Sequence, residues 1–265
     1  MKNAPFKSLV YAKLNLSLKI KGSANGLHVL DSTVCPYFAY SDTAEFFPAD
    51  ISAGLRIETE SALSGFDEKR FLNFFRPKAE AIAKRFEVGG LLKINKGVPL
   101  GAGLGGSSAS VAAALNVMRQ AAEKDKSTAL DTAFLLKLGS DVPCMLYGRA
   151  CRMTGVGEGI KPVEIPINCE DICVRIADGG SDTAACYALY DRFFSEGKRC
   201  FAASGGYVCE PLNTDGGAEL FKNDLTLAAT TLNKNINSLI EEMAAAYKYV
   251  AMSGSGSAVL GYLKK

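Results

Sequence analysis

The residues of this sequence best suited to chemistry form a glycine-rich segment at positions 97–108, GVPLGAGLGGSS. It contains five glycines and runs into an alanine-rich stretch, residues 109–122, that is expected to be helical. Glycines let backbone N–H groups turn toward a guest without interference from a Cβ, and the first turn of a helix adds unpaired donors and a partial positive charge. The junction therefore predicts an anion-binding site whose natural guest is phosphate. The segment itself also allows a plain connector capped by Ser107 or Ser108.

The residues that follow the glycines distinguish this segment from two common nucleotide-binding motifs. A Walker A loop has lysine and a hydroxyl residue after its last glycine, whereas two serines follow here. Gly101, Gly103 and Gly106 do have the spacing of a dinucleotide fingerprint. That motif also needs a second strand ending in an acidic residue about 20 positions later, but the chain continues with a polar turn, residues 121–126, and a helix-like run, residues 130–138. The serine pair fits a phosphate or its Mg²⁺ better than the pyrophosphate of NAD.

Composition restricts the class of protein. The chain has 265 residues, of which 48% are hydrophobic, enough for one large or two modest domains. Its 30 basic and 28 acidic residues give a net charge of +2 without a dense basic block, so nucleic acid is not an expected partner. No apolar run approaches 18 residues and residues 1–9 lack a signal peptide, which predicts a cytoplasmic protein without membrane attachment. The 8 cysteines lack C-x-x-C spacing and are expected to be reduced thiols.

Alternation of apolar and polar residues predicts a half-buried strand over residues 10–20. Lys13 and Asn15 lie on its polar face, about 7 Å apart along the strand. Solvation is the ordinary fate of such residues. The expected elements before the glycine-rich segment are a turn at residues 22–26, a strand at 32–47 and a helix at 68–86 that Pro77 breaks or starts.

After the glycine-rich segment, helices are expected at residues 108–122 and 127–138, followed by a helix start at which Ser140 or Asp141 is the N-cap and Pro143 lies in the first turn. A shift toward glycine and β-forming residues after Gly148 predicts a boundary between two domains, residues 1–150 and 151–265. The second half is expected to contain strands at 172–177, 249–251 and 258–263, and helices at 183–194, 222–227 and 232–246.

Four segments in this order resemble the GHMP kinase superfamily: AKLNL at 12–16, PLGAGLGGSS at 99–108, LGSDVP at 138–143 and MSGSG at 252–256. Further segments at 26–30, 155–158, 183–187 and 222–225 are most similar to the branch that acts on 4-diphosphocytidyl-2-C-methyl-D-erythritol in the non-mevalonate isoprenoid pathway. The resemblance implies an α/β fold of α+β type with two domains. The N-terminal domain would bind ATP and resemble ribosomal protein S5, and the C-terminal α/β domain would be smaller.

The resemblance also implies an activity, the phosphorylation of the 2-hydroxyl of that acceptor by ATP with Mg²⁺. It assigns catalysis to Lys13 and Asp141, and contacts with the acceptor to Asn15, His28 and Tyr187. The phosphate-binding residues that it implies are Pro99, Gly101, Gly103, Leu104, Gly105, Gly106, Ser107 and Ser108, with a second glycine loop at Gly254, Ser255 and Gly256. No metal ligand is assigned, although Ser107 or Ser108 would lie near Mg²⁺.

Three departures from the family pattern concern ligand contacts. Leu27 replaces a tyrosine that would form a second aromatic wall for the cytosine, and Ser107 and Ala109 replace a glycine and a serine of the loop. The family's adenine-side Asn-Leu-Val segment has only an altered counterpart at residues 72–76. The sequence leaves open another GHMP kinase acting on mevalonate, phosphomevalonate or homoserine, a non-catalytic ligand sensor, and an NAD-binding oxidoreductase. A monomer or a homodimer is expected.

Overall fold

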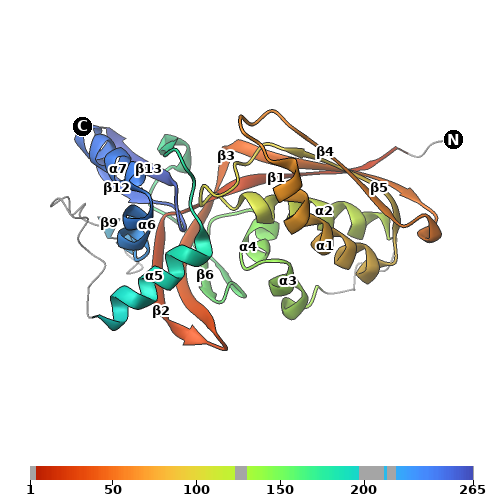
Figure 1. Cartoon of the computed structure of the whole chain (residues 1–265), viewed down its shortest axis with the longest axis horizontal. Coiled ribbons are helices and arrows are strands. Elements are labelled where there is room, and N and C mark those ends of the chain that lie inside the picture. Colours follow the sequence, from red (N-terminus) through yellow and green to blue (C-terminus); the bar gives the residue numbers. More distant parts are fainter. Residues whose placement is uncertain (1–3, 123–129, 197–211, 214–218, 265) are drawn as a thin grey trace. The chain divides into compact units, whose positions relative to one another are not determined.

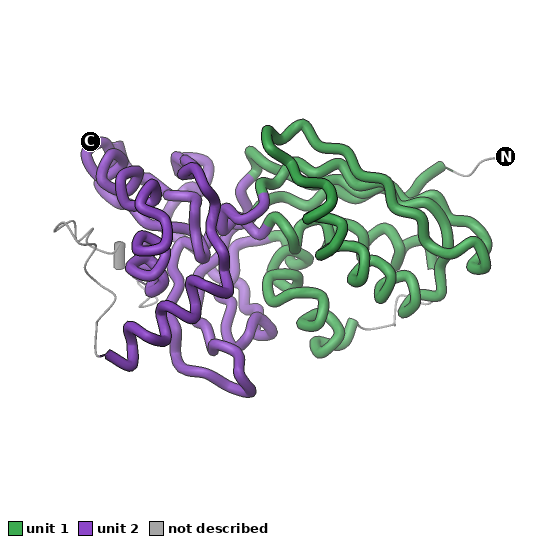
Figure 2. The backbone as a smooth tube through the Cα atoms, viewed as in Figure 1, with its two compact units in different colours: residues 1–12, 38–99, 106–148 green, residues 13–37, 100–105, 149–265 purple. Residues whose placement is uncertain are grey.

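The computed structural model of the chain describes residues 4–122, 130–196, 212–213 and 219–264. The chain forms two compact units, unit 1 with residues 1–12, 38–99 and 106–148, and unit 2 with residues 13–37, 100–105 and 149–265 (Figure 2). The division falls within strands β1 (Phe6–Asn15) and β3 (Leu27–Ala49). Each unit is thus assembled from separate stretches of sequence. The boundary at residues 150 and 151 stays a prediction about separately folding domains.

Unit 1 contains a β-α-β arrangement of β4 (Leu55–Ser61), α1 (Glu68–Phe86) and β5 (Gly89–Lys96). β4 and β5 are parallel, as the helical crossover between them requires, and β5 pairs antiparallel with the second half of β3. β1 pairs with β3 as well. The helix α2 (Gly106–Ala121) packs against α1, and both cover the same face of this sheet (Figure 1). The shorter elements of the unit are the 3-10 turn η1 (Ile51–Ala53), α3 (Thr132–Leu138) and α4 (Val142–Tyr147).

The helix α1 forms because its apolar residues share one face. Asp67 caps its N-terminus by accepting a hydrogen bond from Arg70 N at 2.9 Å. The prediction that Pro77 breaks or starts this helix is wrong, because α1 runs through Pro77 without interruption. Burial on both sides of the proline stabilises the continuous helix. The buried residues of α1 are Phe71, Phe75, Ala79, Ile82, Ala83 and Phe86.

The single strand predicted over residues 10–20 is two strands, β1 and β2 (Ser17–Ala24), separated at Leu16. Leu16 N donates to Thr33 O at 2.8 Å, and Leu16 O accepts from Phe221 N at 2.5 Å. The polar face is also not solvated, since Lys13 and Asn15 are only 6% and 1% exposed. The strand pattern was therefore correct, but other segments cover the face that the pattern assigned to solvent.

Unit 2 contains an antiparallel sheet of β12 (Tyr247–Met252), β13 (Ala258–Lys264) and β8 (Cys173–Ile176). Three helices pack in succession, α5 (Thr183–Ser195), α6 (Thr226–Leu232) and α7 (Lys234–Ala246). The helix predicted over residues 222–227 is wrong at its start, because Lys222 and Asn223 form strand β11, which pairs parallel with β2. The remaining elements of the unit are β6 (Cys151–Gly155), β7 (Gly159–Pro162), η2 (Cys169–Asp171), β9 (Leu212–Asn213) and β10 (Glu219–Leu220).

Two general features bear on the class of protein. Within the described ranges, no helix combines the length and apolar character needed to cross a membrane. The six cysteines in these ranges are free thiols, and four of them are buried. Cys200 and Cys209 lie outside the described residues, as do residues 127–129 of the helix expected at 127–138. Burial raises the pKa of Cys151 to about 11 and that of Cys186 to about 12, so these thiols stay protonated at neutral pH.

Candidate functional site

The glycine loop has the backbone conformation that its composition predicts. Gly101, Gly103 and Gly105 have φ angles of +67°, +73° and +75°, which L-residues with a side chain rarely adopt. Helix α2 begins at the next residue, Gly106. A Cβ at Gly106 would lie 2.9 Å from the carbonyl carbon of Pro99 and 3.1 Å from Val98 O, so glycine is also required there by close packing. The loop thus leads directly into the N-terminus of a long helix, as expected for an anion site.

Within unit 2, the loop is held through its carbonyl groups. Gly101 O accepts from Ser181 N at 2.9 Å and Ala102 O from Ala258 N at 2.9 Å. The next two carbonyls, those of Gly103 and Leu104, accept from Ser253 Oγ and Lys13 N, each at 3.0 Å. Four successive carbonyls therefore point into the protein. This arrangement keeps their partial negative charges away from an anion that binds backbone N–H groups.

Lys13 and Asn15 lie together beside this loop in unit 2. Lys13 Nζ donates to Asn15 Oδ1, and Asn15 Nδ2 donates to Ser32 Oγ at 2.7 Å. Asn15 N donates to Ser253 Oγ at 3.0 Å, and this hydroxyl in turn donates to the loop. The structure thus brings a buried ammonium group, an amide and the glycine loop into one hydrogen-bonded network.

The second glycine loop contacts the first one. A Cβ at Gly254 would lie 3.1 Å from Gly103 O and 3.3 Å from Asn15 Oδ1, so the two backbones are in close contact. Ser255 O accepts from Ser181 Oγ at 2.6 Å, and the Ser255 hydroxyl lies 2.9 Å from that of Thr183. Gly256 lies close to the side chains of Met252 and Ile236. The second loop therefore supports the first rather than forming a separate turn.

Asn223 fixes the second loop and was not predicted as a site residue. Its Nδ2 donates to Met252 O and Gly254 O, both at 2.7 Å, and its Oδ1 accepts from Leu225 N at 2.9 Å. The side chain is buried, with 7% exposure. An Asn-Asp pair in a segment expected to be helical was the only signal in the sequence, since asparagine prefers caps and turns to helix interiors.

Asp141 lies in unit 1 at the N-cap position of α4, with Pro143 in the first turn. Its carbonyl accepts from Met145 N at 3.1 Å. Its half-buried side chain makes no capping hydrogen bond to the helix. Capping is the ordinary role of aspartate at this position, and it does not explain the presence of aspartate here. Lys13 and Asp141 belong to different units, and their action as a pair stays a prediction.

Two serine hydroxyl groups and a lysine ammonium group of unit 1 lie near the start of α2. Ser107 and Ser108 are half-buried in the first turn of the helix. A Cβ at Gly139 would lie 3.2 Å from Ser108 Oγ and 4.0 Å from Lys78 Nζ. The ammonium group of Lys78 lies 3.4 Å from the centre of the Phe74 ring, and burial lowers its pKa to about 8. Lys78 was not predicted as a site residue, because one lysine on an amphipathic helix carries no signal.

His28 and Tyr187 are brought together in unit 2. Their ring centres are 4.5 Å apart with an angle of 30° between the planes. His28 Nε2 lies 2.7 Å from Asp191 Oδ1, an acidic partner that was not predicted. Asp191 follows Tyr187 by four residues on α5, so the side chains of Tyr187 and Asp191 share one face of this helix. Leu27, where the family has tyrosine, is 58% exposed.

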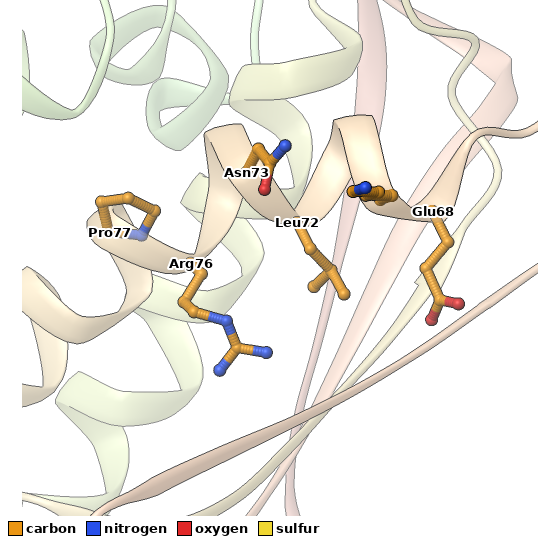
Figure 3. A pocket seen from close by; sticks show the side chains of 6 residues that line it. Glu68, Leu72, Asn73, Arg76 and Pro77 are labelled. Atoms are coloured by element: carbon orange, nitrogen blue, oxygen red, sulfur yellow. The ribbon is translucent and has the colours of Figure 1, made fainter.

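A groove runs along one face of α1 in unit 1, with a volume of about 470 Å³ (Figure 3). An apolar side chain, an amide and a guanidinium group lie along it, the combination that small polar ligands use. Pro77 has no N–H to donate to the carbonyl of Asn73, and both residues line the groove. The lining residues are Glu68, Lys69, Leu72, Asn73, Arg76 and Pro77.

No group of three or more His, Cys, Asp or Glu side chains in the described part of the chain is arranged to hold a metal ion. Magnesium in phosphoryl-transfer enzymes is commonly bound by one or two carboxylates together with the phosphates of the substrate. The hydroxyl groups of Ser107 and Ser108, at a helix N-terminus, fit a role beside such an ion rather than a complete protein site.

Comparisons with known proteins identify the family of the chain. Residues 69–149 match the family GHMP kinases N terminal domain. The 4-diphosphocytidyl-2-C-methyl-D-erythritol kinase of Bradyrhizobium diazoefficiens is 30% identical over 259 residues, covering 93% of this chain and 84% of the relative. The kinase of the same name from Thermoanaerobacter sp. (strain X514) is 31% identical over 264 residues, covering 96% and 86%.

A crystal structure of 4-(cytidine 5'-diphospho)-2C-methyl-D-erythritol kinase has the same fold. It superimposes with a TM-score of 0.65 at 23% identity, covering 97% of this chain and 89% of the other. The two-domain α/β fold and the resemblance found in the sequence are confirmed. The chain therefore belongs to the GHMP kinases and, within them, to the family of 4-diphosphocytidyl-2-C-methyl-D-erythritol kinases.

Proposed function

We propose that this protein transfers the terminal phosphoryl group of ATP to the 2-hydroxyl of 4-diphosphocytidyl-2-C-methyl-D-erythritol. The observation that carries the proposal is identity of 30–31% with relatives of that name over more than four fifths of their length. The convergence of the glycine loop, Lys13 and Asn15 in unit 2 supports it. Mevalonate and homoserine kinases share the fold at only 12–14% identity, so the fold alone does not favour their substrates.

Backbone N–H groups of residues 103–108 bind the β- and γ-phosphates in this proposal. Phosphoryl transfer asks a protein mainly to position donor and acceptor and to neutralise charge that spreads over the phosphate oxygens. Glycine φ angles of +73° and +75° at Gly103 and Gly105, followed by the N-terminus of α2, are suited to this task. Ser107 or Ser108 would lie near Mg²⁺, and the bound ion would neutralise part of the phosphate charge.

Asp141 accepts the proton of the attacking hydroxyl as general base. It lies at the start of α4, in the LGSDVP segment that resembles the family pattern. Lys13 stabilises negative charge that develops during transfer, since a buried ammonium interacts strongly with a nearby anion. Asn15, whose Oδ1 accepts from Lys13 Nζ, orients that ammonium and contacts the acceptor.

The cytosine of the acceptor binds near His28 and stacks on Tyr187. The proximity of the two rings and the suitability of a tyrosine face for a flat base support this assignment. The groove on α1 is our candidate for the adenine of ATP, because Leu72 and Asn73 offer an apolar surface and an amide there. A monomer or homodimer, a cytoplasmic location and the absence of nucleic acid stay predictions.

The test is to incubate the purified protein with ATP, Mg²⁺ and each candidate alcohol separately, and to measure ADP release. The proposal expects release with 4-diphosphocytidyl-2-C-methyl-D-erythritol and not with mevalonate, phosphomevalonate or homoserine. Release with another alcohol would replace the proposed acceptor. ATP binding without release in any mixture would favour a ligand sensor, and a thermal shift with NAD instead of ATP would favour an oxidoreductase.

A further inference from the structure

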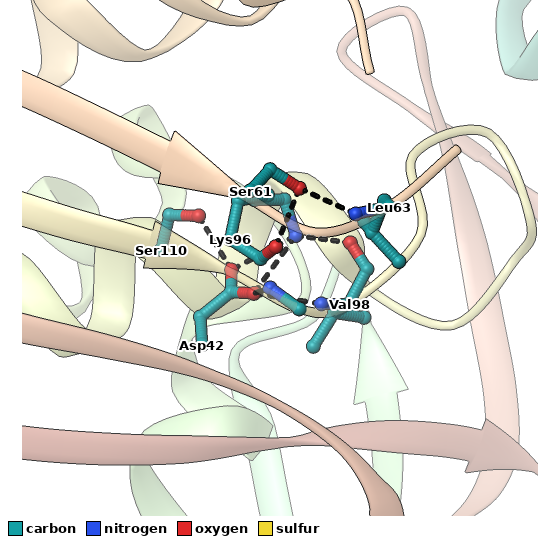
Figure 4. Close-up of polar contacts among 7 residues, drawn as sticks. Asp42, Ser61, Leu63, Lys96, Val98 and Ser110 are labelled. Carbon is teal, nitrogen blue, oxygen red and sulfur yellow. Dashed lines mark hydrogen bonds and ion pairs between the residues drawn. The ribbon is translucent and has the colours of Figure 1, made fainter. Parts of the chain in front are cut away.

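A buried ion pair lies in unit 1 where the chain leads into the glycine loop (Figure 4). Asp42 on β3 and Lys96 at the end of β5 are both fully buried. Lys96 Nζ donates to both carboxylate oxygens, at 3.0 and 2.9 Å. Asp42 precedes Thr43 and Lys96 follows Asn95, and Thr43 and Asn95 are paired across the two strands. The antiparallel register therefore brings Asp42 and Lys96 together.

The carboxylate of Asp42 also accepts three hydrogen bonds from elements at the two ends of the loop. Gly97 N and Val98 N donate to Oδ1 at 2.9 and 2.8 Å. Ser110 Oγ, in the second turn of α2, donates to Oδ2 at 2.5 Å. Lys96 Nζ donates in addition to Val98 O. One carboxylate is thus bonded both to the segment before the loop and to the helix after it.

Stability alone is a weak explanation for this arrangement. Burial of two charges carries a large desolvation cost, and replacing a buried ion pair by apolar side chains of similar volume is often neutral or stabilising. Burial also lowers the pKa of Lys96, against the opposing effect of Asp42. What apolar residues cannot supply is the set of directed bonds to Gly97, Val98 and Ser110, and these bonds fix backbone positions.

We propose that Asp42 is a positioning residue for phosphate binding, because its carboxylate holds the segment before the glycine loop and the first turns of α2 at a fixed separation. This inference rests on the proposed binding of ATP by the loop. The N–H groups that face a phosphate must keep their geometry to within a fraction of an ångström. Lys96 orients the carboxylate by donating to both of its oxygens, and the hydrogen bond from Ser110 links the carboxylate to the helix.

The test is the dissociation constant of ATP with Mg²⁺, measured by titration calorimetry without any acceptor. Asp42→Asn keeps the size of the side chain but places an amide NH₂ where an acceptor of Lys96 or Ser110 is needed. The dissociation constant is expected to rise at least tenfold. The matched control is Ile82→Ala, which removes a fully buried side chain of α1 and makes no hydrogen bond to the loop. Its dissociation constant is expected to stay within twofold of wild type.

Ser110→Ala is the second variant, because it removes one donor and leaves the ion pair in place. An increase of at least threefold is expected for it. A folded Asp42→Asn protein whose ATP affinity stays within twofold of wild type would overturn the inference. If Asp42→Asn fails to fold, the result for Ser110→Ala decides. A rise of at least threefold in its ATP dissociation constant supports the inference, and a value within twofold of wild type overturns it.

These outcomes separate the inference from the proposed function. Wild-type protein that binds ATP but phosphorylates none of the alcohols would refute the function, and the binding measurements on the variants would still decide the role of Asp42. Wild-type protein that does not bind ATP would refute both. Normal turnover of the acceptor by wild type together with unchanged ATP affinity in Asp42→Asn would refute the inference alone.

Discussion

Substitution of Gly103 by alanine tests the close contact between the two glycine loops. Gly103 has a φ of +73°, and a Cβ there would overlap the carbonyl oxygen of Ser253. It would also lie 3.0 Å from Ser253 C and 3.1 Å from Gly256 N. All of these are backbone atoms, so no side chain can rotate away to make room. The loops must separate to accept the methyl group.

The expected loss of stability has two parts. Alanine at a left-handed φ costs about 1 kcal/mol relative to glycine, and forcing a packed backbone apart costs about 1–3 kcal/mol more. We therefore expect Gly103→Ala to lower the free energy of unfolding by about 2–4 kcal/mol. Displacement of the N–H groups around residue 103 is expected to weaken ATP binding about tenfold or more.

Urea unfolding and calorimetric titration with ATP measure the two effects. The matched control is Gly26→Ala, in the turn between β2 and β3, since Gly26 has a nearly equal φ of +75° and nothing within 4 Å of a Cβ. It should lose only about 1 kcal/mol and keep its ATP affinity. Equal stability and equal ATP affinity in the two variants would refute the contact between the loops.

Three further predictions concern single side chains. Asp141→Asn should lower kcat about 100-fold or more and leave the ATP dissociation constant within about threefold, as steady-state kinetics and calorimetry will measure. Asn223→Ala leaves two carbonyls and one N–H without their partner and should cost about 2–4 kcal/mol in urea unfolding. Burial lowers the pKa of Lys78 to about 8 from an ordinary 10.5, so the unfolded chain binds more protons at this group between these pH values, and the contribution of Lys78 to stability rises with pH. The raised pKa values of the buried thiols Cys151 and Cys186 act in the opposite direction, so the quantity to measure is the free energy of unfolding of wild type minus that of Lys78→Met. This difference should rise by on the order of 1 kcal/mol across the range for a half-exposed group.

The sequence allowed the glycine loop to be predicted because the loop is determined locally. Its glycines set the backbone conformation, and the alanines that follow favour a helix wherever the rest of the chain lies. The observed α2 differs from the expected helix by only one or two residues at each end. The identity of the ligand, by contrast, came from the resemblance, because any phosphate suits such a loop.

Contacts distant in sequence account for what could not be predicted. The alternating pattern around Lys13 identified a strand but not the burial of its polar face, because Ser32 and Gly254, which lie against the Asn15 side chain, come from other segments of the chain. Asn223 was assigned to a helix because local propensity does not reveal its bonds to Met252 and Gly254. Asp42 had no signal, since one aspartate in a strand-like segment does not reveal a partner 54 residues away.

The central claim is that the loop ahead of α2 binds the terminal phosphates of ATP. A crystal structure of the protein with Mg²⁺ and a non-hydrolysable ATP analogue tests it most directly. The account predicts β- and γ-phosphate oxygens at about 2.7–3.2 Å from backbone nitrogens within residues 103–108. A triphosphate bound elsewhere, with none of these N–H groups in hydrogen-bonding range, would contradict it.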